Sequence, residues 1–209
     1  MCIHKHAEML YHNIAGKISE FNKIVAEDLI TTPDGDLLAK LLSKWTDHKT
    51  CMTMIRDILM YMDRTYVTTN KLTPVFDVGL ESFRDNVVAD REIVSRIKKL
   101  LLENVHKERE GEIIDRNTMR GVLTMMVEVG VNSLQTYQTH FEEDFLAQTR
   151  LFYSQEAQKF IDTHTCPDFV RKAENRISEE KDRIAHYING SSEVKLMETV
   201  DECFITKNA

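Results

Sequence analysis

Prolines and glycines, the residues that interrupt regular structure, are scarce in this chain, with only 3 prolines and 7 glycines among 209 residues. Between them, apolar residues recur at spacings of three and four, which is the periodicity of amphipathic helices. No run of any length alternates apolar and polar residues as a half-buried strand does. The sequence therefore predicts an all-α protein whose helices are joined by short turns.

The expected helices follow one another with short breaks. A turn at 31–36 precedes helices at 37–45 and 51–67, and Thr73 and Pro74 resemble an N-cap and a first helical residue. Asp115 is a predicted N-cap, and Gly111 and Gly130 are predicted helix ends. Later helices are expected at 137–163 and 167–188, with a last segment toward Phe204. The first helix carries an apolar stripe at Ile3, Ala7, Leu10, Ile14, Phe21, Val25 and Leu29.

The start of the chain shows no helix-capping residue. Met1 is followed directly by Cys2 and Ile3, whereas helices usually open with serine, threonine, aspartate or asparagine. We therefore expect Met1 to lie inside a helix that begins earlier.

The segment CMTMIRDILMYMDRTYV, residues 51–67, has one ordinary and one unusual face. Wound as a helix, it places Met52, Ile55, Leu59, Met62 and Tyr66 on an apolar stripe that should face the core. The opposite face carries Met54, Asp57, Tyr61 and Arg64. Tyrosine and arginine are enriched among interface hot spots. This face is a candidate partner site, and the alternative is a face that meets only water or the rest of the protein.

Few residues suggest catalysis or metal binding. His4, His6 and His12 share a helix, but their spacings do not gather three rings around one metal as i, i+4 spacing would. Glu142–Asp144 and Glu179–Glu180 are read as solvated residues or salt-bridge partners, because neighbours in a helix point about 100° apart. The methionines of 122–130 are more simply core residues than a binding groove. We expect a binding or scaffold protein that is not an enzyme and needs no cofactor or metal.

Composition excludes several other classes. The formal net charge of −7 lacks the basic footprint of a nucleic-acid binder. No run approaches the roughly 18 apolar residues of a membrane span, and the N-terminus has no apolar signal core. The four cysteines show no Cys-x-x-Cys spacing and are expected to be reduced thiols of a cytoplasmic or nuclear protein.

Several segments, in order, resemble the N-terminal region of the cullin family, and most closely the member that binds BTB-domain adaptors. They are HKHAEMLY (4–11), KWTDHKTCMTMIRDILMYMDRTYV (44–67), GLESFRDNVV (79–88), EREGEIIDR (108–116), YQTHFEEDFLAQTRLFYSQEAQKFI (137–161) and FVRKAENRISEEKDRIAHYI (169–188). The resemblance covers essentially the whole chain.

The resemblance implies a helical solenoid of stacked cullin repeats, the stalk of a cullin-RING E3 ubiquitin ligase. Residues 1–136 would form a first repeat that lacks its N-terminal helix and a half, and residues 137–209 an incomplete second repeat. A BTB-domain adaptor would dock on Met54, Asp57, Tyr61 and Arg64. The alternative is a truncated cullin-like fragment that folds but binds adaptors little or not at all. The family's RING-docking domain lies outside this sequence, so we do not expect the chain alone to support ubiquitin transfer.

One packing prediction concerns the last two long helices, which are expected to lie against each other. Five aromatic residues should be largely buried between them: Tyr137, Phe141, Phe145, Phe152 and Phe160.

Overall fold

A computed structural model describes residues 2–161 and 165–206 of the chain. Every regular element within these ranges is helical, which confirms the all-α prediction. The longer helices are α1 (Cys2–Ile30), α2 (Asp34–Ile58), α5 (Val75–Phe83), α6 (Arg91–Arg109), α7 (Arg116–Glu128), α9 (Glu143–Ile161), α10 (Cys166–His186) and α11 (Glu193–Asp201). The short ones are α3 (Met60–Met62), α4 (Thr68–Asn70) and α8 (Gln135–Tyr137), the π-helical turns η1 (Asp63–Val67), η2 (Arg84–Val88), η3 (Gln138–Glu142) and η5 (Glu202–Thr206), and the 3-10 turn η4 (Gly190–Ser192).

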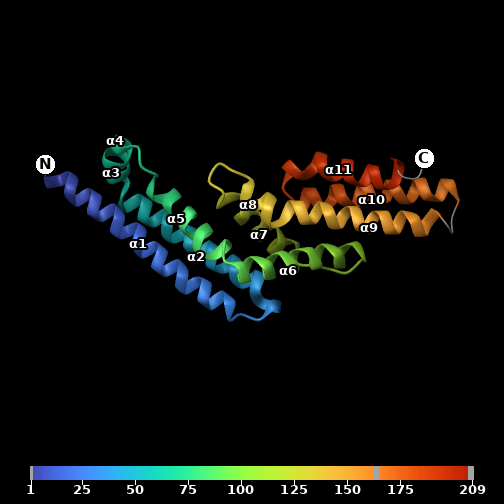
Figure 1. Cartoon of the computed structure of the whole chain (residues 1–209), viewed down its shortest axis with the longest axis horizontal. Helices are drawn as coiled ribbons and strands as arrows, with labels where there is room; N and C mark the ends of the chain where they lie inside the picture. Colours follow the sequence, from blue (N-terminus) through green and yellow to red (C-terminus); the bar gives the residue numbers. More distant parts are fainter. Residues whose placement is uncertain (1, 162–164, 207–209) are drawn as a thin grey trace.

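The helices form an elongated molecule with the two ends of the chain at opposite ends (Figure 1). In one half, α5 packs on α1 and α2, and α2 also packs on α7. In the other half, α9, α10 and α11 pack on one another and run side by side. We call α1, α2, α5, α6 and α7 the first helical group, and α9, α10 and α11 the second. Helix α6 contacts α1 and α2 and extends beneath α9, so it links the two groups.

One continuous apolar core runs through both groups, from Leu29 and Trp45 to Tyr153 and Val200. A smaller cluster joins Met52, Met62 and Val75 to Ile18 of α1. Partly buried side chains complete this second cluster, namely Tyr11, Ile14, Ile55, Leu59, Tyr66 and Phe76. The predicted core stripe of 51–67 therefore does face the interior.

The predicted stripe of the first helix is partly wrong. Leu10 and Phe21 are 44% and 56% exposed, whereas Ile18 and Asn22 are buried. Position 22, not 21, continues the three-and-four spacing through Ile18, and Asn22 is accommodated because its Nδ2 donates to Ser82 Oγ at 2.9 Å. An amide whose Nδ2 is hydrogen-bonded, but whose buried Oδ1 accepts no hydrogen bond from the described residues, thus takes an interior place that the hydrophobicity pattern assigned to a phenylalanine.

Two separate helices were expected at 37–45 and 51–67, and this prediction is wrong. A single helix, α2, runs from Asp34 to Ile58, because residues 46–50 contain no glycine or proline. It starts directly after Pro33, so the turn predicted at 31–36 is shorter. The chain breaks at Leu59 (φ −96°, ψ 11°) and continues as α3 and η1.

Helix ends are set largely by the residues that the sequence indicated. Asp115 Oδ1 accepts hydrogen bonds from the backbone of Asn117 (3.0 Å) and Thr118 (3.1 Å), as an N-cap should. Gly111 follows α6 with φ +92°, a conformation that favours glycine. The prediction for Thr73 is off by one residue, because the N-cap of α5 is Pro74.

The burial predicted for the aromatic residues is confirmed for the first three and wrong for the last two. Tyr137 and Phe141 lie on α8 and η3, which pack chiefly on α7 and α6 and not in the predicted seam between the last two long helices. Tyr137, Phe141 and Phe145 are fully buried, but Phe152 and Phe160 are only partly so. Tyr153 takes the interior position that was predicted for Phe152 and is fully buried.

The methionines of α7 face the core as predicted, with Met125 and Met126 completely buried.

Candidate interaction surface

The four residues singled out in the sequence lie on three consecutive elements. Met54 and Asp57 belong to the end of α2, Tyr61 to α3 and Arg64 to η1. All four side chains are exposed, with Met54 at 62% and Tyr61 at 78%. The break at Leu59 means that they do not share one continuous helix, as the prediction assumed. Within the described part of the chain, no hydrogen bond or ion pair joins any two of them.

This surface carries two further exposed apolar residues that were not predicted to belong to it. Ile58 is 79% exposed and Met60 is 48% exposed. The signal was present, because Met54, Ile58 and Tyr61 recur at i, i+4 and i+7, a second apolar stripe on the side opposite the core. We call Met54, Asp57, Ile58, Met60, Tyr61 and Arg64 the α2–η1 face. An exposed apolar group of this kind, flanked by charges, is typical of an interaction site.

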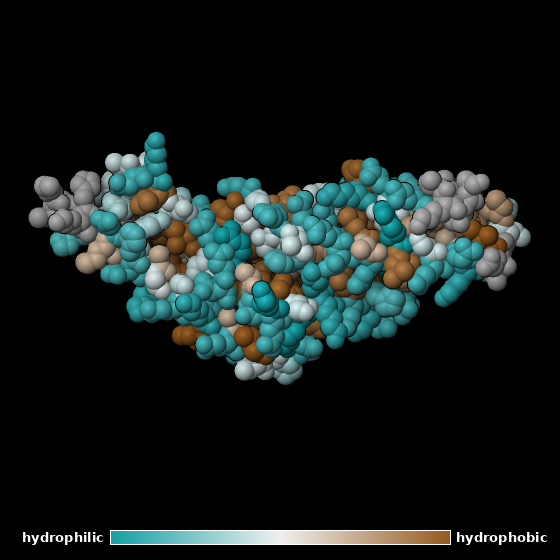
Figure 2. Space-filling model, in the orientation of Figure 1, coloured by the Kyte–Doolittle hydropathy of each residue, from teal (hydrophilic) through white to brown (hydrophobic). Residues whose placement is uncertain are grey.

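A groove lies beside this face, between α1 and the end of α2. It measures about 350 Å³ and is lined by Asn13, Ile14, Lys17, Ile18, Ile55, Ile58 and Leu59. Ile58 belongs both to the groove and to the α2–η1 face. The apolar surface is therefore continuous from α2 to α1, and brown apolar patches are interspersed with polar ones over the surface in Figure 2.

The two charges of the face differ in their surroundings. Arg56 donates to Asp57 Oδ1 from Nε (3.1 Å) and from NH2 (2.9 Å). This pair is exposed, so it stabilises little and can exchange for a partner's charge. Arg64 forms no ion pair with any residue the structure describes. Its guanidinium can bind a carboxylate of another molecule.

Two hydrogen bonds near the face hold η1 and the loop before α5 in place. The Tyr11 hydroxyl donates to the Thr73 carbonyl at 2.8 Å, and the backbone N–H of Val75 donates to Asp63 Oδ1 at 3.2 Å. Burial and the nearby carboxylates of Glu81 and Asp63 raise the pKa of Tyr11, so its hydroxyl stays protonated. Such anchoring reduces the ordering cost of binding a partner. The π-helical turn η1 is a rare conformation that often occurs at functional sites.

The predicted roles of the carboxylate clusters are confirmed in part. Glu142 binds Lys195 at 2.6 Å, and Glu180 binds Arg109 at 2.9 Å and Arg183 at 2.8 Å. Both glutamates are salt-bridge partners, as one alternative proposed, but they are buried, which the sequence pattern did not predict.

The histidines of α1 show no ligand geometry among the described side chains. His12 is exposed, and its Nδ1 lies 2.9 Å from the Glu8 carbonyl. No group of three or more histidine, cysteine or acidic side chains that could hold a metal occurs in the described ranges. The same ranges contain no helix long and apolar enough to cross a bilayer.

Comparison with known proteins identifies the family. The family model for the cullin alpha solenoid domain matches residues 1–209. The chain belongs to the cullin family. Its fold is accordingly the all-α repeat fold that the resemblance implied.

Among cullin relatives, Cullin-3 of Dictyostelium discoideum is 42% identical over 208 residues, which is 100% of this chain and 27% of the relative. Cullin-3B of Arabidopsis thaliana is 39% identical over 208 residues, again 100% of this chain and 28% of the relative. The chain thus spans little more than a quarter of these proteins. A shorter relative, Cullin-like protein 3 of Arabidopsis thaliana, is 32% identical over 199 residues, 95% of this chain and 77% of the relative.

Proposed function

We propose that this cullin-family chain is a scaffold module of a cullin-RING E3 ubiquitin ligase and that it docks BTB-domain substrate adaptors on the α2–η1 face. In this proposal, residues 1–136 form the first cullin repeat, residues 137–209 begin the second, and the module works in the cytoplasm or nucleus. The similarity to Cullin-3 proteins supports the scaffold role. A scaffold positions other proteins and needs no catalytic group of its own.

The exposure of Tyr61 is the observation that carries the docking proposal. Its side chain is 78% exposed, next to Met60, although a tyrosine ring gains free energy from burial. Its hydroxyl forms no hydrogen bond with any residue the structure describes. Tyrosine can bury its ring against a partner and keep its hydroxyl bonded, which makes it a frequent hot spot.

The neighbouring residues would complete the site. Met54, Ile58 and Met60 add exposed apolar side chains to the same face, and these can help to exclude water from the anchor. Asp57 and Arg64 lie at the edge, where charges influence orientation and association rate more than affinity. The face therefore suits a partner that offers an apolar contact together with a carboxylate.

A second candidate is a short cullin-like protein that folds but has no adaptor-binding or ligase role. The observation in its favour is the similarity to Cullin-like protein 3, of which this chain covers 77%. In that case the α2–η1 face would bind no BTB domain.

A calorimetric titration with a panel of BTB domains tests the proposal. We expect binding at about micromolar affinity or weaker. Replacing Tyr61 with alanine should cost about 2 kcal/mol of binding free energy, roughly thirty-fold in Kd. The melting temperature should not change, because the side chain makes few contacts within the protein.

Leu151→Ala provides the matched control, since Leu151 is 60% exposed but lies on α9 in the second helical group. It should bind like the unmodified chain. Equal losses for Tyr61→Ala and Leu151→Ala would remove the α2–η1 face from the proposal. If the unmodified chain binds no BTB domain, the second candidate is favoured.

A further inference from the structure

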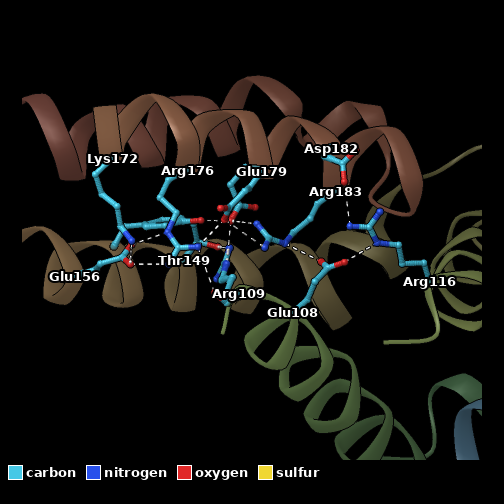
Figure 3. A network of polar contacts seen from close by, with 12 residues as sticks. Glu108, Arg109, Arg116, Thr149, Glu156, Lys172, Arg176, Glu179, Asp182 and Arg183 are labelled. Atoms are coloured by element: carbon cyan, nitrogen blue, oxygen red, sulfur yellow. Dashed lines mark hydrogen bonds and ion pairs between the residues drawn. The ribbon is translucent and has the colours of Figure 1, made fainter. Parts of the chain in front are cut away.

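A buried network of charged side chains lies where the first helical group meets the second (Figure 3). Glu108 and Arg109, from the last two positions of α6, enter the space between α9 and α10. Their partners come from the second group, chiefly Glu180 and Arg183 of α10. The side chains of these four residues are between 0% and 9% exposed.

The bonds of the network cross the joint in both directions. Arg109 Nε donates to Glu180 Oε1 at 2.9 Å, and its NH2 donates to Thr149 Oγ1 of α9 at 2.7 Å. Arg183 Nε donates to Glu108 Oε2 at 2.8 Å, and its NH1 donates to Glu180 Oε1 at 2.8 Å. Each of α6 and α10 thus contributes one arginine and one glutamate, two ion pairs cross the joint, and the Arg183–Glu180 bond lies within α10. Each bond has a defined direction.

Aromatic rings hold the Arg109 guanidinium on its other sides. It lies 5.5 Å from the ring centre of Phe145, 5.4 Å from that of Phe152 and 5.2 Å from that of Tyr153. The Tyr153 hydroxyl also donates to Glu180 Oε1. A cation enclosed in this way has little room to turn, and α6 cannot rotate against α9 without breaking its contacts.

Stability alone does not explain this arrangement. Desolvation of buried charges offsets much of their attraction, and apolar residues of similar volume often serve as well. Glu180 Oε2 is buried and accepts no hydrogen bond from the described residues, which adds to the cost. Apolar contacts tolerate small sliding and rotation, whereas these bonds permit a narrow range of angles. The buried hydrogen bonds and ion pairs therefore favour one orientation of α6 relative to α9 and α10.

We propose that the Arg109–Glu180–Arg183–Glu108 network is an orientation lock that sets the angle between the two helical groups. The proposal stands on the joint alone and does not depend on which partner binds the α2–η1 face. In an elongated scaffold, the angle between the two helical groups sets the position of the far end of the molecule. Over the length of α1, 29 residues or about 43 Å, a rotation of about 10° displaces the far end by roughly 7 Å.

The test measures the angle and the stability separately. Spin labels are attached to cysteines introduced at exposed Lys23 of α1 and exposed Glu174 of α10, after the native cysteines are replaced. Pulsed electron resonance then gives the distribution of distances between the labels. The main variant combines Arg109→Met, Glu180→Leu and Arg183→Met, so no charge of this trio is left without its partner. Glu108 keeps its contacts with Arg116 and Tyr187.

We expect the triple variant to keep its helicity and to melt at or above the temperature of the unmodified chain. Its distance distribution should become at least about twice as wide, or its mean should shift, because the directional bonds made by Arg109, Glu180 and Arg183 are gone. A distribution whose width and mean are both unchanged would show that packing alone sets the angle, and would overturn the proposal.

Two further variants complete the test. Lys49→Met with Glu128→Leu removes a 2.7 Å ion pair inside the first group and should leave the distribution unchanged. Broadening there equal to that of the triple variant would also overturn the proposal. Arg109→Lys keeps the charge but loses the planar fork that binds Glu180 and Thr149 together. It should broaden the distribution, and it decides the question if the triple variant does not fold.

Discussion

Asn22 and His48 show at the scale of single residues how this protein buries polar groups. The Asn22 amide donates to Ser82 Oγ at 2.9 Å, and His48 Nε2 lies 3.0 Å from the Gly79 carbonyl, to which it donates as a neutral ring. Both residues connect a long helix to α5. The hydrogen bonds replace those that Asn22 Nδ2 and His48 Nε2 lose to water, whereas the buried Asn22 Oδ1 accepts none from the described residues.

His48 should make stability depend on pH. Burial lowers the pKa of His48, and the hydrogen bond to Gly79 only partly opposes this. Below about pH 6.5 the unfolded chain binds a proton that folded His48 does not. The stability that the neutral ring provides is thus complete above that pH and is lost as the pH falls toward the folded-state pKa.

Urea denaturation at about pH 7.5 and pH 5.5 measures this effect. The free energy of unfolding should fall between the two, and it should fall less in His48→Gln. Some dependence should persist, because burial and Lys98 lower the pKa of His140 in the same direction. An identical change in the variant and the unmodified chain would assign the pH dependence to other groups.

Phe145 should be among the residues most sensitive to truncation. Its ring is fully buried and stacks on Phe141 with centroids 5.2 Å apart. Phe145→Ala should cost about 3–5 kcal/mol in free energy of unfolding, measured by urea denaturation. Phe160→Ala is the control on the same helix and should cost clearly less, because its ring is partly exposed. Similar costs would contradict the burial seen here.

At the scale of elements, short polar contacts decide where helices begin and how they connect. Asp90 and Asp115 accept backbone hydrogen bonds in the first turns of α6 and α7. Asp63 belongs to η1 but accepts from Val75 at the start of α5. The segment that carries Tyr61 is therefore tied to the following helix by a side chain that sequence spacing does not single out.

Asp115 offers a prediction for a single helix. Its Oδ1 accepts from two backbone N–H groups and its Oδ2 from the Thr118 hydroxyl at 2.7 Å. Asp115→Ala should cost about 1 kcal/mol of unfolding free energy, and Asp115→Asn should cost little, since asparagine caps helices equally well. Chemical denaturation of the three proteins provides the comparison. A large loss in Asp115→Asn would mean that the charge, and not the cap, is required.

For the whole molecule, the shape is the property most open to measurement. The two helical groups extend in opposite directions from their joint, so the molecule is long instead of spherical (Figure 1). A compact domain of 209 residues would have a radius of gyration of about 17 Å. Small-angle scattering of the monomer should give a clearly larger value. A value near that of a compact domain would indicate that the groups fold onto each other in solution.

Much of this architecture could be predicted because its signals are local. Spacings of three and four predicted the helices, Asp115 and Gly111 predicted two of their ends, and the stripe of Met52 and Met62 predicted the buried side of 51–67. The exposed positions of Met54, Asp57, Tyr61 and Arg64 followed from the same periodicity. Their role in binding stays a prediction, because exposure alone does not identify a partner.

By itself, the sequence determined the helical class, the cullin family and the buried side of the segment 51–67. Only the tertiary structure decided that α2 breaks at Leu59, that Asn22 replaces Phe21 in the interior, and that Glu180 is a buried ion. The physical reason is the separation along the sequence between the residues that interact. Periodicity and caps depend on residues a few positions apart. The burial of Glu180 depends also on Arg109, 71 positions away, which the packing of α6 on the second helical group brings beside it.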